Sequence, residues 1–488
     1  MVEESCCQES YSNNKLRKMI LISSGIAIGN VCFSFNYYLA LIFCLLQVSG
    51  LLYLFVKGKY LEYFCFYLIC TTYSLEFDFY NCPFWSLKNF RFLGINLCVW
   101  LLIPLLASVL YNMRFQQYRE RQFRVGHNIK NGMLSLAILA IIIGALNIYL
   151  NDNNIRNLNG YLVAFGEGIY TYMAYIILPM FIFSYFIFDE NRQKIVKSCI
   201  NAILAGAVIA MVFASFWEMK GQNAGQEIII SNVTNIIFGA FTLLVSLQYD
   251  GKFRKMYLIL GILGVILSFK NVVMGKILVI LFAILVLYCL NLLFYQGKKG
   301  ILICLIFAAL IGTLMFVYFP IMMRNNHTFQ WKMRQLISML TFWEEGWWEN
   351  MESSPKARLE ETLNIFLEYV KKPLQIFLGK GLLGSFESHT GMYQNMPNDF
   401  SGYTKAEWEN RSFYNVHETF NVLFLSNGLL GIGYIVYILK VALRKMLKNP
   451  YIVMGAVWFM FFYGYSMTIS CFGIACLLLG GVLIDERR

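Results

Sequence analysis

Long apolar runs alternate with short polar segments along most of this chain. A bilayer core holds no water, so a backbone that crosses it must satisfy its own hydrogen bonds, and an apolar run of about 17 to 25 residues is therefore predicted to be a helix. About fourteen runs fit this description, although the shorter ones only approach that length. They cover residues 19–34, 37–56, 60–75, 92–112, 132–150, 166–188, 198–217, 227–247, 256–269, 277–295, 301–322, 417–438, 450–467 and 469–485.

Lysine and arginine residues are clustered before the first run and after every second run that follows. These clusters lie at residues 15–18, 57–59, 114–130, 192–197, 252–255, 298–299, 444–448 and 487–488. Short cytoplasmic loops carry the excess of Lys and Arg in membrane proteins. The alternation therefore predicts a multi-pass protein whose N- and C-termini are both cytoplasmic.

One connection on the opposite side, residues 323–416, is far longer than the others. It divides the chain into an N-terminal transmembrane bundle at 1–322 with about eleven spans, this extracytoplasmic loop, and C-terminal transmembrane helices at 417–488 with about three spans. A loop longer than about 15 residues is usually functional or disordered, and the many aromatic residues of this loop argue against disorder. The predicted fold is an all-α polytopic membrane protein with short helices in one large extracytoplasmic loop.

Within the loop, Ser354 and Pro355 are typical of a helix start, and apolar residues then recur at helical spacing until Lys372 and Pro373. The following segment, LGKGLLGSF, contains Gly379, Gly381 and Gly384. Glycines in this arrangement permit left-handed or closely approaching backbone. We expect a turn against the membrane surface or against a ligand phosphate.

Composition agrees with a membrane protein, since 58% of the residues are hydrophobic and 14% are charged, whereas soluble domains are about 25% charged. The net charge of +12 reflects the clusters between spans rather than a basic face, so no nucleic-acid partner is expected. Most of the 13 cysteines lie in apolar runs. They are expected to be small buried hydrophobic residues and not disulfides or metal ligands.

A histidine motif opens the first span after the loop. The sequence VHETF contains His417, and the sequence GLLG begins eleven residues later at Gly428. Together with the preceding helix around Arg358 and the glycine segment, this spacing resembles the O-antigen polymerase and O-antigen ligase superfamily over about 75 residues. Two positions differ from that family, which usually has asparagine where Glu418 stands and a Ser-Arg pair where Ser268, Phe269 and Lys270 stand.

The resemblance implies a bacterial cytoplasmic membrane enzyme that acts on the outer face. Its partners would be membrane lipid, an undecaprenyl-diphosphate-linked oligosaccharide and a chain-length regulator, and its reaction would be glycosyl transfer without cofactor or metal. Such a reaction needs cations for the leaving diphosphate and a base for the attacking hydroxyl. We expect His417 and Arg358 to be catalytic, and Glu418 and Trp408 to bind substrate. The expected diphosphate-binding residues are Lys270, Lys276 and Arg411.

Each expectation has an alternative. An arginine near a bilayer surface often only contacts lipid headgroups, a histidine at a helix start can cap the helix, and tryptophans can be interfacial anchors. Glu76 and Asp78 resemble the acidic pair of metal-dependent enzymes, but they lie in a different loop. Besides a polymerase, a ligase that uses another acceptor fits the motif. A lipid-linked oligosaccharide flippase is also possible, although such transporters usually show two similar halves.

Overall fold

The computed structural model describes a large part of the chain, in segments. The described residues are 2–33, 36–74, 86–87, 90–92, 95–116, 124–149, 173, 175–183, 190–216, 233–248, 253–268, 285–294, 330, 333–335, 337–338, 341, 343–382, 384–390, 403, 405–414, 416, 418–445 and 450–462.

This part of the chain is mostly helical, with two short antiparallel strand pairs, β1–β2 and β3–β4. The elements are, in chain order, α1 (Val2–Phe33), α2 (Tyr37–Val56), α3 (Tyr60–Tyr73), β1 (Arg91–Phe92), β2 (Ile95–Asn96), α4 (Leu97–Trp100), α5 (Ile103–Gln116), α6 (Arg124–Tyr149), α8 (Glu190–Phe216), α9 (Val233–Gln248), α10 (Arg254–Ser268), α14 (Trp347–Asn350), α15 (Ser353–Lys371), α16 (Pro373–Leu378), β3 (Phe386–Glu387), α17 (Lys405–Asn410), β4 (Ser412–Phe413), α18 (Thr419–Lys445) and α19 (Pro450–Phe462).

Three of these helices contain apolar stretches that are long enough to cross a membrane, namely Tyr37–Val56, Asn128–Asn147 and Thr419–Lys445. Four shorter apolar helices accompany them, at Leu97–Leu110, Lys197–Phe213, Leu285–Phe294 and Tyr451–Met460. The protein is thus a mostly helical chain with helices suited to a bilayer. The total of about fourteen spans stays a prediction, because runs such as 301–322 and 469–485 lie outside the described residues.

The predicted helix at 92–112 is wrong at its start. The segment begins with the β1–β2 hairpin, and the helical part is divided into α4 and α5. Pro104 explains the division, because proline has no N–H to bond the carbonyl of residue 100 but is well tolerated in the first turn of a new helix. The indole N–H of Trp100 donates to the Phe92 carbonyl at 3.0 Å and fixes the hairpin against α4.

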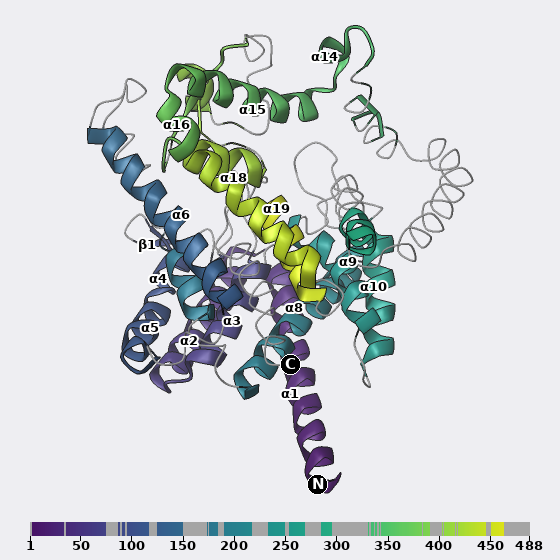
Figure 1. Cartoon of the computed structure of the whole chain (residues 1–488). Coiled ribbons are helices and arrows are strands. Elements are labelled where there is room, and N and C mark those ends of the chain that lie inside the picture. Colours follow the sequence, from purple (N-terminus) through teal and green to yellow (C-terminus); the bar gives the residue numbers. More distant parts are fainter. Residues whose placement is uncertain are drawn as a thin grey trace.

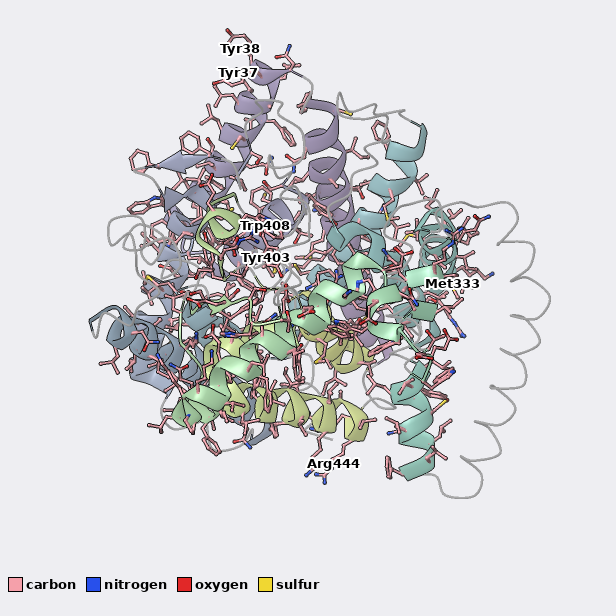
Figure 2. The ribbon with its side chains drawn as sticks, turned by 90° about the horizontal axis from the view of Figure 1, so that it is seen from above. Tyr37, Tyr38, Met333, Tyr403, Trp408 and Arg444 are labelled. Atoms are coloured by element: carbon pink, nitrogen blue, oxygen red, sulfur yellow. The ribbon has the colours of Figure 1, made fainter. Side chains whose placement is uncertain are left out.

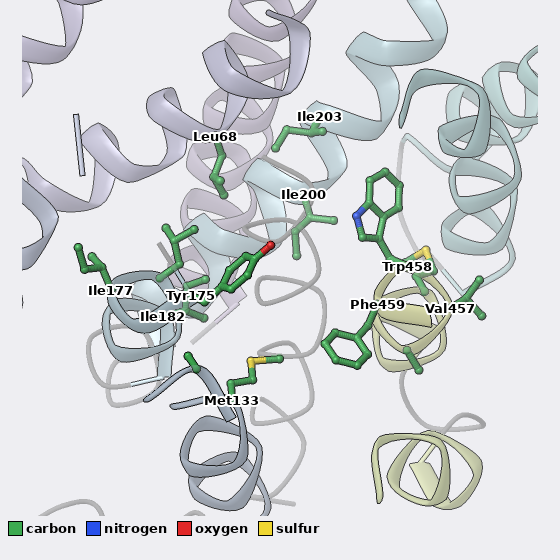
Figure 3. Close-up of a cluster of buried hydrophobic side chains, with 14 of the residues drawn as sticks. Leu68, Met133, Tyr175, Ile177, Ile182, Ile200, Ile203, Val457, Trp458 and Phe459 are labelled. Atoms are coloured by element: carbon green, nitrogen blue, oxygen red, sulfur yellow. The ribbon is translucent and has the colours of Figure 1, made fainter. Parts of the chain in front are cut away.

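The core consists of apolar and aromatic side chains contributed by helices from both ends of the chain. Figure 3 shows this mixing, with Tyr175 and Ile200 near Trp458 of α19. Trp458 is completely buried and stacks on Phe238 with ring centroids 5.1 Å apart. Of the seven cysteines whose side chains the structure describes, five are buried, as the sequence predicted.

The helices of the long loop lie at one end of the molecule. Figure 1 shows α15 and α16 above α18, whereas α1 begins at the opposite end. The view from above in Figure 2 shows α15 crossing this end of the bundle with Tyr403 and Trp408 beside it. The described residues between 343 and 416 therefore form a folded cap on the helices, and we call them the cap.

Candidate functional site

The candidate site is organised by α15, the helix that the sequence predicted between Ser354 and Lys372. It spans Ser353–Lys371, and Pro355 lies in its first turn as expected. The predicted serine cap is wrong, because the N-cap residue is Glu352 and its side chain makes no capping hydrogen bond. Pro373 ends the helix and starts α16. The amphipathic helix itself is confirmed.

One face of α15 binds the start of α18 through polar side chains. Arg358 Nε donates to Glu418 Oε1 at 2.9 Å, and the two side chains are 27% and 30% exposed. One turn further along, Thr362 Oγ1 donates to Asn421 Oδ1 at 2.6 Å, and Asn421 Nδ2 donates to Glu361 Oε2 at 2.9 Å. These contacts join residues about 60 positions apart and fix the two helices in register.

The Glu361 carboxylate is completely buried in this interface. Burying a carboxylate is costly unless it accepts hydrogen bonds, and Tyr403 supplies one by donating its phenol proton to Glu361 Oε1 at 2.5 Å. Tyr403 also packs edge-on against Trp408 and Phe413. The buried carboxylate therefore ties α15 and α18 to the aromatic part of the cap.

Trp408 is only 4% exposed, and its ring contacts the rings of Tyr403 and Phe413. The expected sugar-stacking role would need an exposed ring face, so burial accounts for this tryptophan as a core residue of the cap. Arg411 follows in the turn between α17 and β4, where its backbone is left-handed with φ 51°. The Arg411 side chain is exposed, and its guanidinium lies 6.0 Å from the centre of the Trp408 ring.

The glycine segment forms a turn that packs against protein backbone. Gly379 and Gly381 have φ values of 74° and 77°, a region that residues with a Cβ rarely adopt. A Cβ at Gly379 would lie 2.3 Å from the backbone nitrogen of Asn427, and one at Gly381 would lie 2.3 Å from that of Gly144. The predicted turn is confirmed, but its expected position against the membrane surface or a ligand phosphate is wrong, because these glycines lie between α6 and α18.

The N–H groups of this turn are bonded to carbonyls of the neighbouring helices. Lys380 N donates to Leu425 O at 2.7 Å, and Gly381 N donates to Ser426 O at 3.0 Å. Leu382 N donates in the same way to a carbonyl of α6, at 2.7 Å. These donors are consumed by the protein itself, so the turn is not a free cradle for a ligand phosphate.

The turn meets α18 where that helix is broken. Gly428 has φ 58° and ψ −143°, which no regular helix contains. A break of this kind leaves preceding carbonyls without their usual donors, and such groups must be satisfied inside a membrane. Tyr369 of α15 donates its phenol proton toward the carbonyls of Phe424 and Leu425, at 2.7 and 2.9 Å. Together with the N–H groups of Lys380 and Gly381, it satisfies the carbonyls that the break exposes.

Burial raises the pKa of Tyr369, and the negative charge of neighbouring Glu368 raises it further. The phenol is therefore protonated at every physiological pH, and it remains a donor to the broken helix. Glu368 itself pairs with Lys380, whose Nζ also donates to the Ser385 carbonyl at 2.5 Å. His389 Nε2 lies 3.5 Å from the same carboxylate. This second polar cluster holds the far side of the glycine turn.

Among the expected site residues, the structure brings Arg358 and Glu418 together. His417, Lys270 and Lys276 lie outside the described residues, as do Glu76 and Asp78. The neighbours of His417 are described, and Glu418 has an unusual left-handed backbone with φ 59°. Strained backbone of this kind is frequent near functional sites. In the described part of the chain, no three His, Cys, Asp or Glu side chains are placed to hold a metal ion.

Sequence reasoning missed three residues that build this site: Glu361, Tyr369 and Asn421. A signal was available for Asn421, which lies four positions after His417 and so one helical turn further along. Glu361 likewise follows Arg358 by three positions. Tyr369 had no local signal, because its partners are carbonyls that a distant glycine exposes. The chain matches no family model, no curated protein sequence and no solved structure.

Proposed function

We propose that this protein is an envelope polysaccharide polymerase with about fourteen spans in the bacterial cytoplasmic membrane. It would join undecaprenyl-diphosphate-linked oligosaccharide repeat units on the outer face. The observation that carries the proposal is the placement of Arg358, whose guanidinium is partly exposed and bonded to Glu418, the residue that directly follows His417. A fixed cation and a histidine segment are thereby held at one end of an apolar helical bundle.

The chemistry needs both groups. The acceptor hydroxyl oxygen bonds to the anomeric carbon of the donor sugar, the bond from that carbon to the diphosphate oxygen breaks, and the hydroxyl proton passes to His417. Negative charge develops on the leaving undecaprenyl diphosphate, where the Arg358 guanidinium stabilises it. Preorganised donors of this kind act where charge develops and are often the largest catalytic contribution. Arg411, Lys270 and Lys276 are the further cations of the proposal, and no metal is required.

Support for the site also comes from how firmly Arg358 is held. Its helix is anchored to α18 by Thr362, which bonds Asn421, and by Tyr369, which bonds the carbonyls near the break. The pairing of Glu368 with Lys380 anchors the same helix to the glycine turn. Catalytic groups have to be held close to their productive geometry by packed neighbours. A ligase that transfers glycan to a different acceptor would use the same groups, and it is the second candidate for that reason.

The test replaces Arg358 and His417 in cells that depend on this protein for surface polysaccharide. Arg358→Ala should lower the rate about 100- to 1,000-fold, and His417→Ala about 100- to 10,000-fold, at unchanged abundance in the membrane. Arg358→Lys should restore part of the activity, because lysine keeps the charge without the planar fork. The measurement is the chain-length distribution on a gel, with Glu349→Gln, an exposed residue of α14, as the matched control.

The accumulated intermediate separates the candidates. Loss of a polymerase leaves single repeat units at the outer face, whereas loss of a ligase leaves long lipid-linked chains without an acceptor. Loss of a flippase, the alternative from another class, leaves repeat units on the cytoplasmic leaflet. Wild-type chain lengths in both alanine variants would refute the assignment of the site.

A further inference from the structure

The helix α15 has three faces, and within the described part of the chain two of them are covered by other segments. One face binds α18 through Arg358 and Thr362, and a second binds the segment after the glycine turn through Asn364 and Glu368. The third face is apolar and continues onto α16. It consists of five side chains that are between 39% and 76% exposed: Leu363, Phe366, Val370, Leu374 and Phe377. We call these five residues the apolar stripe.

The stripe is continuous with the exposed apolar flank of α18. The short helix α16 packs directly on α18, where the Gly428 position meets the carbonyl of Ile376 and the backbone of Phe377. On α18 itself, Leu429, Leu430 and Val436 are exposed, in a helix that is long and apolar enough to cross a membrane. Exposed apolar side chains on such a helix face lipid. The stripe therefore extends a lipid-facing surface onto the cap.

The place where the glycine turn meets α18 also puts α16 at the level of the lipid-facing surface. Its glycine turn meets α18 at Ser426 and Asn427, which lie seven and eight residues after Thr419, the first residue of that helix. At a rise of 1.5 Å per residue, this corresponds to roughly 10 to 12 Å along the axis of α18. The turn therefore contacts α18 well inside that helix and not at its first residue, and α16, which directly precedes the turn, lies beside the same part of α18.

Charge at the stripe points to an anionic surface. Lys371 is the last residue of α15 and Lys372 joins that helix to α16, and both are exposed. Amphipathic helices that lie in the plane of a membrane typically carry Lys or Arg beside an apolar face that contains Phe and Leu. The lysine stems can lie along apolar surface while their ammonium groups reach lipid phosphates.

We propose that the apolar stripe is inserted in the adjacent leaflet of the bilayer, and that Lys371 and Lys372 bind the phosphates of anionic lipids there. The cap is then fastened to the membrane by its own helix as well as by α18. Because Arg358 lies on the same helix, the membrane sets the height at which that guanidinium is presented. This interaction depends on the amphipathic surface alone and holds whether or not the protein is a polymerase.

The experiment measures membrane depth at single positions of the full-length protein. A ketone-bearing amino acid is introduced at Phe366, Leu374 or Phe377 and carries a spin label, so the native cysteines do not react. The protein is placed in nanodiscs, and collisions of the label with oxygen, which enters hydrocarbon, are compared with collisions with a neutral nickel chelate, which stays in water. Glu387, exposed on β3 beside α15, is the matched control.

The ratio of oxygen to nickel collisions should be severalfold higher at all three stripe positions than at Glu387. Adding phosphatidylglycerol to phosphatidylcholine nanodiscs should raise it further at Phe377, and K371Q together with K372Q should remove that increase. Monodisperse elution of each variant confirms folding. Ratios at the stripe equal to the ratio at Glu387 would overturn the proposal, and so would protection from both reagents, which would indicate a second protein on the stripe.

Discussion

In the described part of the chain, the helix is broken between α4 and α5 and again within α18. The carbonyl groups exposed at these two breaks receive their hydrogen bonds from different sources. The break between α4 and α5 exposes carbonyls that two tyrosines of α3 satisfy, since Tyr63 donates to Leu101 O at 2.6 Å and Tyr67 donates to Cys98 O at 2.8 Å. Each phenol serves one carbonyl. The break in α18 is repaired by the cap, which supplies one phenol and two backbone N–H groups of the glycine turn.

The difference lies in what each break depends on. The first has a local cause, Pro104, and its repair uses side chains alone. The second occurs at Gly428 without a proline, and its repair requires the backbone of Gly379 to lie against α18. A phenol can keep its hydrogen bond when the two helices shift slightly, because its side chain can rotate. A close backbone contact cannot, so we expect substitutions at the α18 break to destabilise the protein more than substitutions at the α4–α5 break.

The largest effect is expected for Gly428→Ala. The added Cβ would lie 2.4 Å from the Ile376 carbonyl oxygen, and the backbone conformation is one that only glycine adopts easily. Strain of about 1–3 kcal/mol and overpacking of about 1–3 kcal/mol add to a destabilisation of about 2–6 kcal/mol. The apparent melting temperature in nanodiscs should fall by many degrees, and the cap should become sensitive to protease.

Gly433→Ala is the control for that variant, because it lies in the same helix and an added Cβ would have no neighbour within 4 Å. Alanine is favoured over glycine inside helices by about 0.5–1 kcal/mol, so this variant should be neutral or slightly more stable. Equal stability of both variants would mean that the break in α18 does not need glycine.

Within the described residues, the helices of the bundle were largely predictable, whereas the junction between cap and bundle was not. α2 begins and ends where its apolar run does, at Tyr37 and Val56, because lipid leaves few other structures for such a run. The break at Pro104 was missed although its signal is local. The sequence singled out Gly428 as the start of the GLLG motif but did not predict a break there, since glycine is tolerated within a helix and the contact with Gly379 makes the difference.

The candidate site was also predictable only where the signal lies in the local sequence. Motif spacing identified Arg358 and the segment around Glu418, and the structure pairs these two residues. The buried Glu361 was overlooked because a carboxylate on an amphipathic helix normally faces water. Its burial depends on Asn421 and Tyr403, which arrive from distant parts of the chain.

A smaller effect is expected from Tyr369→Phe, which removes the phenol at the α18 break. Leaving a buried carbonyl unsatisfied costs about 1–3 kcal/mol. The Phe424 carbonyl would lose its donor, whereas the Leu425 carbonyl keeps the N–H of Lys380, and the contact that the phenol makes between α15 and α18 would also be lost. Tyr67→Phe is the matched change at the other break, where one carbonyl loses its donor. Melting temperatures should fall for both variants, and further for Tyr369→Phe. A larger loss for Tyr67→Phe would reverse the order of fragility argued above.

The smallest effect on stability is expected from Glu418→Gln, which removes the charge that faces Arg358. Both side chains are more than a quarter exposed, and ion pairs in contact with water contribute about 0–1 kcal/mol. The glutamine oxygen can still accept from Arg358 Nε, so much of the hydrogen bond is retained. The melting temperature should change by a degree or two, and the difference from wild type should shrink in 1 M salt, where charges are screened over about 3 Å.

Glu418→Gly provides a second comparison, because glycine relieves the left-handed backbone at this position. If stability is nearly unchanged in both variants, the Arg358–Glu418 pair is not what holds the cap in place, and the partly exposed arginine is not needed for the framework. A loss as large as that of Gly428→Ala would instead make the pair part of the framework and weaken its assignment to the site.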